Sequence, residues 1–284
     1  MAVTQGQHVE KKSVFSSERE QNQSEARRGM PSFLKTAGLA LIVPLLILAL
    51  WEGATRFGLV AGNQLPAPSA VVGTIWGMAQ DGSLWTHMGI TMYRILWGFF
   101  WGTAAAAALG ALVAVSKKAE VLFDPTVQAI RAIPSLAWVP LFILWFGIGE
   151  PSKVTLIALG VFFPVYLNVV GGIQSVDRKL VEVGRAYGLS QLQIIRRIIL
   201  PASMPSFLTG LRSGLGLGWM FVVAAELLGA SEGLGYLLVL GQNTSAPAVI
   251  LASIVLFAFL GKTTDYVLKK IQTRVLHWQD NVKT

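Results

Sequence analysis

Long stretches without a charged side chain alternate with short clusters of basic residues along most of the chain. Four stretches of 16 to 23 residues carry no charge, and two further apolar stretches contain one cation each, Arg212 and Lys262, near the same predicted membrane face. Because a helix rises about 1.5 Å per residue, about 20 apolar residues span the hydrocarbon core of a bilayer. The pattern therefore predicts an all-α, polytopic membrane protein with six transmembrane helices, at about residues 33–51, 93–116, 130–149, 154–176, 206–228 and 248–268.

The distribution of basic residues gives the orientation of these six spans. Of the 23 Lys and Arg residues, 20 fall in the segments on one side and 3, namely Arg56, Arg94 and Lys153, on the other. Cytoplasmic loops of membrane proteins carry the excess of Lys and Arg. Both termini are therefore expected in the cytoplasm.

The ends of the chain are polar. Residues 1–32 are rich in Ser, Gln, Glu and basic residues, which predicts a disordered cytoplasmic tail, and residues 271–284 are expected to form a second cytoplasmic tail. A cleavable signal peptide is not expected, because the first apolar stretch starts only after residue 32 and lacks a small-residue cleavage site. The region between the two tails, residues 33–270, reads as one transmembrane domain.

One cytoplasmic segment, residues 177–204, has an apolar periodicity of its own. The apolar positions recur at three- and four-residue spacing on each side of Gly188: Leu180, Val183 and Tyr187 before it, and Leu192, Ile195 and Ile199 after it. This predicts two short amphipathic helices joined at a glycine, the 177–204 hairpin. Its apolar stripe packs either on the ends of the chain's own spans or in a groove of a partner protein.

The same segment carries a spaced motif. Its members are Glu182, Gly188, Ile198, Leu200 and Pro201. This spacing resembles the EAA loop of ABC importer permeases, with Val183 and Gly184 in place of the two alanines. The resemblance implies that the hairpin is the coupling helix that inserts into a cleft of an ATPase subunit. A bulky residue at Gly188 would then uncouple ATP hydrolysis from transport or prevent docking of the ATPase.

The resemblance covers most of the chain after residue 33. The stretches that carry it are Ile133–Leu141, Leu144–Gly149, Glu182–Leu189 and Gly229–Tyr236. They look like the nitrate, sulfonate, taurine and bicarbonate branch of these permeases, and within it the aliphatic sulfonate permeases are closest.

Membership of that branch would imply a location and a set of partners. The chain would be a homodimer in the bacterial inner membrane, with two cytoplasmic ATP-binding subunits and a periplasmic or lipid-anchored solute-binding protein. ATP and Mg would be used by the ATPase subunits, and this chain would bind no cofactor. The expected solute is a small oxyanion, first an aliphatic sulfonate, with nitrate, taurine or bicarbonate as alternatives. A self-sufficient secondary transporter is the alternative of another class, although ionisable groups for a coupling ion are nearly absent from the spans.

Small and polar residues within the spans suggest further roles. Gly210, Gly214 and Gly218 repeat on one face of the fifth span, which favours close packing inside the chain or at a dimer axis. Prolines in the third and fourth spans (Pro134, Pro140 and Pro164) favour kinks. Candidates to line a substrate pathway are Asn168, Trp219 and Glu226; packing is the alternative for Trp219, and a structural or gating role for Glu226.

Composition and motifs exclude several other classes. The chain is 53% hydrophobic and only 13% charged, which is not typical of a soluble domain. The net charge of +8 is spread between apolar runs, so nucleic-acid binding is not expected, and the absence of cysteine excludes thiolate metal sites. A G-x-S-x-G match at 229–233 requires a strand-turn-helix setting, and Gly261-Lys262-Thr263 lacks the first glycine of a phosphate-binding loop, since position 256 is Leu. Neither a catalytic site nor a metal site is predicted.

Overall fold

A computed structural model describes residues 32–278, with side chains from residue 42, and every regular element in this part is a helix. The described residues fall into two compact units, which divide between Gly62 and Asn63. In the first unit the described element is α2 (Ser32–Arg56), which contains Pro44 and ends with an ion pair between Arg56 Nε and Glu52 Oε1 at 2.7 Å. The predicted tail 1–32 lies outside the described residues except for Ser32.

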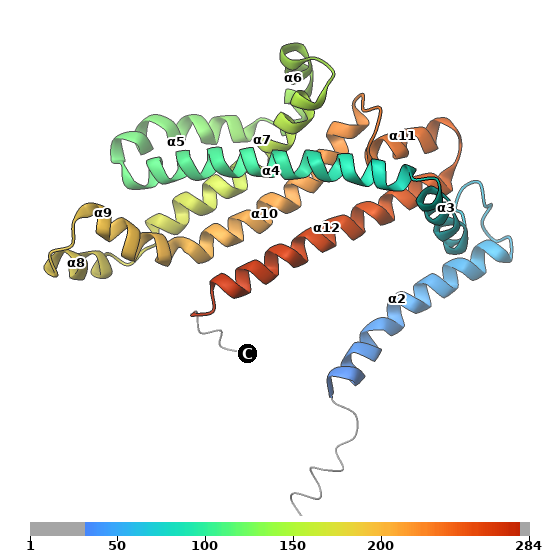
Figure 1. Ribbon diagram of the computed structural model, residues 1–284, viewed down its shortest axis with the longest axis horizontal. Coiled ribbons are helices and arrows are strands. Elements are labelled where there is room, and N and C mark those ends of the chain that lie inside the picture. The colour runs from blue at the N-terminus through green and yellow to red at the C-terminus, as the bar shows by residue number, and fades with distance from the viewer. Residues whose placement is uncertain (1–31, 279–284) are drawn as a thin grey trace, which may run out of the picture. The chain divides into compact units, whose positions relative to one another are not determined.

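Three long helices form the centre of the second unit: α4 (Ser83–Val115), α7 (Glu150–Gln174) and α10 (Leu200–Leu227). They lie side by side, and α12 (Pro247–Val275) follows α10 (Figure 1). Their shared core is aliphatic and aromatic, with Ile95, Val161, Tyr166 and Val222 fully buried.

Glycines set the close approach of these helices. A Cβ on Gly102 of α4 would lie 2.5 Å from the carbonyl oxygen of Ala158, and one on Gly214 of α10 would lie 2.9 Å from Cγ2 of Val165. Lipid offers no hydrophobic drive for helix association, so the spans gain contact by bringing backbones together at small residues. Both α4 and α10 therefore pack directly on α7.

Two short helices at one end of the unit were not predicted. The segment before the second span was treated as a connector, but it contains α3 (Pro68–Gln80), and α11 (Leu234–Asn243) follows α10. A second core unites them with α4 and α12: its buried members are Leu84, Leu234, Leu237, Leu256 and Leu260. Between α3 and α4, Asp81 accepts hydrogen bonds from Ser83, which hold the pKa of Asp81 below its usual value.

The predicted third span, residues 130–149, is not a continuous helix. Helix α5 (Lys117–Ala132) ends before Pro134, and the 3-10 turn η1 (Ser135–Trp138) with α6 (Val139–Phe146) continues at an angle of 93°. A residue before proline is pushed out of the helical region, and Ile133 is extended with φ −75° and ψ 126°. Pro134 therefore produces a break where the hydropathy alone predicted a span.

The all-helical fold is confirmed. Within the described residues, four helices are long and apolar enough to cross a membrane, or up to five if the bent pair of α5 with η1 and α6 counts as one span. α2 covers the first predicted span, 33–51, but the side chains of its first ten residues lie outside the described part, so the number six stays a prediction. α4 begins ten residues before the predicted start at 93, and α12 continues beyond 268 into the predicted C-terminal tail.

Candidate functional site

The 177–204 hairpin begins with two short helices, α8 (Arg178–Ala186) and α9 (Gln191–Ile194). Asp177 caps α8 by accepting a hydrogen bond from the Lys179 amide at 2.9 Å, and Ser190 caps α9 in a capping box with Gln193. Gly188 between them has φ +74°, a left-handed conformation that favours glycine. The structure therefore has the two predicted helices, turning at the predicted glycine.

The second arm does not end before the fifth span, as the sequence pattern suggested. α9 passes through a π-helical turn, η2 (Ile195–Ile199), into α10, so that residues 191–227 form one helix. Proline has no N–H and clashes with the carbonyl of the residue four positions earlier. The wide turn just before Pro201 accommodates that proline without breaking the helix.

Two of the motif residues, Gly184 and Ile198, meet in the interior of the hairpin. Gly184 is buried, and a Cβ there would lie 2.6 Å from Cδ1 of Ile198 on the second arm. Glu182 lies exposed on α8, and Leu200 and Pro201 are the first residues of α10. The small residue at 184 thus lets the two arms contact each other at Ile198.

The outer face of the hairpin is apolar and exposed. Tyr187 is 83% exposed and Leu192 is 73% exposed, while Leu180 and Val183 beside them are half-exposed. Clustered exposed apolar side chains of this size mark an interaction surface. The hairpin therefore presents an apolar face that the described part of the chain leaves uncovered.

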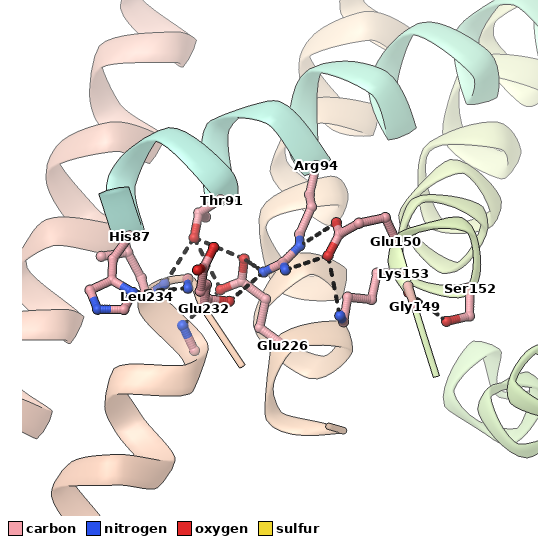
Figure 2. A network of polar contacts seen from close by, with 12 residues as sticks. His87, Thr91, Arg94, Gly149, Glu150, Ser152, Lys153, Glu226, Glu232 and Leu234 are labelled. Atoms are coloured by element: carbon pink, nitrogen blue, oxygen red, sulfur yellow. Dashed lines mark hydrogen bonds and ion pairs between the residues drawn. The ribbon is translucent and has the colours of Figure 1, made fainter. Parts of the chain in front are cut away.

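A buried polar network lies at the other end of the long helices (Figure 2). Arg94 of α4 donates from Nε and Nη2 to Glu150 at 2.7 and 2.6 Å, and from Nη1 to Oε1 of Glu226 at 2.8 Å and to the carbonyl of Glu232 at 2.7 Å. Both Arg94 and Glu226 are 1% exposed. A buried ion pair is tolerated when its remaining donors and acceptors are also satisfied.

The other partners of Glu226 complete this network. Its carboxylate accepts hydrogen bonds from the Thr91 hydroxyl at 2.8 Å and from the Gly235 amide at 2.7 Å, and Glu150 also pairs with Lys153 at 3.3 Å. Two cations and two carboxylates thus face one another. The network ties the third and fourth turns of α4 and the first turn of α7 to the end of α10 and the start of α11.

The glycine-rich segment 229–235 covers this network. Gly233 has φ +116°, and a Cβ there would lie 2.6 Å from both Arg94 Nη1 and Glu226 Oε1. The Gly233 amide also donates to Nδ1 of His87 at 3.1 Å. Ser231 of the G-x-S-x-G match therefore lies in a loop between two helices, a setting that the nucleophile motif does not have.

The three pathway candidates are all engaged within the chain. Glu226 belongs to the polar network, Asn168 donates from Nδ2 to the Pro164 carbonyl at 2.8 Å, and Trp219 donates from Nε1 to Oγ1 of Thr264 on α12 at 2.9 Å. Their role in a pathway stays a prediction. Among the described residues, no group of three or more His, Asp and Glu side chains could hold a metal ion.

The packing glycines lie at helix contacts inside the chain. A Cβ on Gly210 would lie 2.6 Å from Cβ of Asn168, and one on Gly218 would lie 3.0 Å from Cδ1 of Ile95. Sequence analysis missed the matching glycines of α4 and the role of Arg94, which it counted only as a cation on the outer side. The partners of Arg94 are 56 and 132 residues away, so no local pattern indicates them.

Comparison with known proteins decides the family. Residues 98–277, more than half of the chain, match the family described as binding-protein-dependent transport system inner membrane component. The chain belongs to this family. The permease is therefore an inner-membrane component of an ABC importer, and ATP is used by its partner ATPase.

Two relatives and one solved structure are similar to this permease. SsuC of Bacillus subtilis (strain 168), described as an aliphatic sulfonates transport permease protein, is 40% identical over 241 residues, 85% of this chain and 87% of SsuC. SsuC of Escherichia coli (strain K12), described in the same way, is 39% identical over 236 residues, 83% of this chain and 90% of that one. A structure of the MetNI methionine ABC transporter in an inward-facing conformation has a TM-score of 0.57 at 21% identity, covering 74% of this chain and 98% of that chain.

Proposed function

We propose that this permease is the membrane subunit of an importer for aliphatic sulfonates. It would act as a homodimer with two cytoplasmic ATP-binding subunits and a solute-binding protein on the outer side. The two SsuC relatives support the choice of solute, since each shares about 40% of its residues with the permease over more than four fifths of this chain. Taurine, nitrate and bicarbonate are the alternative solutes.

The exposed apolar face of the 177–204 hairpin carries the proposal. Tyr187 and Leu192 belong to this face, and the same hairpin carries five exposed basic side chains: Arg178, Lys179, Arg185, Arg196 and Arg197. An amphipathic helix of this kind suits an apolar groove with an acidic rim. We assign that groove to the ATP-binding subunit.

Movement of the hairpin would be transmitted through the helix that continues it. α9, the π-helical turn and α10 form one helix of residues 191–227, α10 packs on α7 at its glycines, and the polar network fixes the far end of α10 to α4 and α7. Closure of the ATP-binding subunits would then rotate the long helices together between inward- and outward-facing states, a rigid-body change.

The first experiment tests the docking face. The tagged permease is purified with its ATPase from native membranes, carrying either Tyr187→Glu or Leu192→Glu. We expect both variants to lose the co-purifying ATPase, because a buried carboxylate without a partner opposes docking. Gln191→Glu is the matched control, since it places the same charge at an exposed position of the same hairpin and should retain the ATPase. Retention of the ATPase by all three variants would refute the docking face.

A second experiment tests the solute. The purified complex with its binding protein is reconstituted in liposomes, and uptake of butanesulfonate, taurine, nitrate and bicarbonate is compared with and without ATP. We expect ATP-dependent uptake of butanesulfonate. If nitrate is the only anion taken up, the proposed solute is wrong but the assignment as an ABC permease is unaffected. Uptake by the permease without ATPase or ATP would support the secondary-transporter alternative.

A further inference from the structure

An ion pair joins α10 and α12 in the half of these helices nearer the 177–204 hairpin. Arg212 donates from Nε to Oδ1 of Asp265 at 3.0 Å and from Nη2 to Oδ2 at 3.2 Å. Each of the two side chains is 37% exposed, in contrast to the fully buried Arg94. Arg212 lies 12 residues, or about 18 Å, along the helix from Leu200. The pair is therefore well inside the length of α10 and open on one side.

A cavity of about 300 Å³ opens next to this pair, and every residue that lines it is polar. The lining residues are Thr209, Arg212, Ser213, Asp265 and Gln272. Before residue 260 the exposed positions of α12 are apolar, such as Val255 and Phe259, and after it Lys262, Lys269 and Lys270 are exposed as well. Polar groups in a transmembrane helix are costly against lipid and turn toward water or protein instead. The polar lining therefore favours a cavity that faces water or protein over one that faces hydrocarbon.

The cavity carries hydrogen-bond donors that the described part of the chain does not use. Both oxygens of Asp265 are engaged by Arg212, while Nη1 of Arg212, the Ser213 hydroxyl and the Gln272 side-chain amide have no hydrogen-bond partner within residues 42–278. Thr209 donates its hydroxyl to the Pro205 carbonyl at 3.0 Å. A guanidinium, a hydroxyl and an amide are the groups that bind the oxygens of an oxyanion.

We propose that this cavity is a transient binding site for the transported oxyanion in the inner half of the permeation path. The inference rests on the proposed function, because it assigns the solute of the importer to these residues. Arg212 contacts the anion with its free Nη1, Ser213 and Gln272 add hydrogen bonds, and Asp265 offsets the charge of Arg212. The formal charge of the pair is zero, so the anion is held weakly and leaves again, as conduction requires.

The first test uses the absence of cysteine from the chain, which makes a single introduced thiol unique in the permease. Ser213→Cys is labelled in the purified permease–ATPase complex with two water-soluble methanethiosulfonates, one carrying a sulfonate and one carrying a quaternary ammonium. We expect the sulfonate reagent to react faster, butanesulfonate to slow its reaction, and Arg212→Gln to lower its rate by about fivefold. Val255→Cys is the control at an exposed apolar position of α12 and should stay unlabelled.

Two outcomes of this labelling would overturn the proposal. An unreactive thiol at position 213 would mean that a second copy of the permease or lipid covers the cavity. Equal rates for the two reagents, unchanged by Arg212→Gln, would mean that the cavity is wet but does not attract anions.

The second test separates binding of the anion from a purely structural ion pair. Uptake and ATPase activity of the reconstituted complex are measured for Arg212→Gln, Arg212→Lys, Asp265→Asn and the double variant Arg212→Gln/Asp265→Asn. We expect uptake per ATP to fall about tenfold in Arg212→Gln, to recover in part with Arg212→Lys, and to stay low in the double variant. Asp265→Asn leaves a net positive charge, so we expect both the KM for the anion and the turnover to fall.

Full recovery of uptake in the double variant would overturn the proposal, because a structural pair is repaired by neutralising both partners. Failure of the wild-type complex to take up any of the four anions would instead refute the proposed function. In that case the labelling rates at position 213 still show whether the cavity attracts anions. Failure of the anion site and failure of the proposed function can therefore be told apart.

Discussion

Arg94 is a charged side chain with almost no exposed surface. The charge is tolerated there because acceptors from three other parts of the chain, Glu150, Glu226 and the Glu232 carbonyl, bind it. Removing one member of a buried ion pair leaves an uncompensated charge, which costs about 3 to 5 kcal/mol. Arg94→Ala is therefore expected to lower the thermal unfolding temperature of the purified permease strongly. Lys117→Ala is the control, since Lys117 is 83% exposed and pairs only with Glu120, so its loss should be nearly neutral. Equal effects of the two substitutions would contradict the clamping role of the polar network.

At Gly188 we expect substitutions to act through the backbone conformation and not through the volume of the new side chain. Its φ is +74°, and no atom lies within 4 Å of the position that a Cβ would occupy. Gly188→Ala and Gly188→Leu are therefore expected to weaken the hairpin by a similar amount, about 1 kcal/mol, and Gly188→Asn by less. Hydrogen exchange of the α8 and α9 amides measures this. A loss that rises with side-chain size would contradict this expectation. The separate hypothesis that bulk at this position uncouples ATP hydrolysis from transport or prevents ATPase docking stays a prediction.

The contact between α4 and α7 depends on glycines that face the neighbouring backbone. A Cβ on Gly102 would meet the Ala158 carbonyl at 2.5 Å, and a backbone oxygen cannot move aside as a side-chain end can. Gly102→Ala is expected to destabilise the permease by at least about 1 kcal/mol through separation of the two helices. Gly89→Ala, on the same helix with nothing within 4 Å, is expected to be neutral or slightly stabilising. Thermal unfolding of the two variants side by side checks the difference.

Hydropathy predicts the helices that are long and apolar enough to cross a membrane. Runs without charge predicted α7 and most of α4, and an apolar run interrupted by Lys262 predicted most of α12. The same criterion overlooked α3 and α11, which are too short to span, and overlooked the break at Pro134, because an interrupted apolar run has the same hydropathy as a continuous one.

The candidate site was predictable only where its residues are close in sequence. The 177–204 hairpin carries its own periodicity and motif, so both arms and the turn at Gly188 could be predicted. The pairs Arg94–Glu226 and Arg212–Asp265 join residues more than 50 positions apart, and only packing of α4, α10 and α12 brings them together.

For the whole molecule, the predicted orientation places the hairpin in the cytoplasm and the end of α3 outside. Gln80 and Gln191 are both exposed, at the end of α3 and the start of α9. A membrane-impermeant maleimide is expected to label Gln80→Cys once the outer envelope is opened, and Gln191→Cys only after the inner membrane is permeabilised. Labelling of both at the first step would contradict the orientation.

The π-helical turn at residues 195–199 gives the long helix a property that a uniform α-helix lacks. A π turn contains one residue more than an α turn, and successive residues of a helix are about 100° apart around its axis. If the extra residue moves by one position along the chain, the residue it passes turns by about that angle while the helix stays hydrogen-bonded. The turn thus gives the connection between the hairpin and α10 a position where one side chain can change the face it presents, while the helix on either side stays continuous and still carries movement of the hairpin to α10.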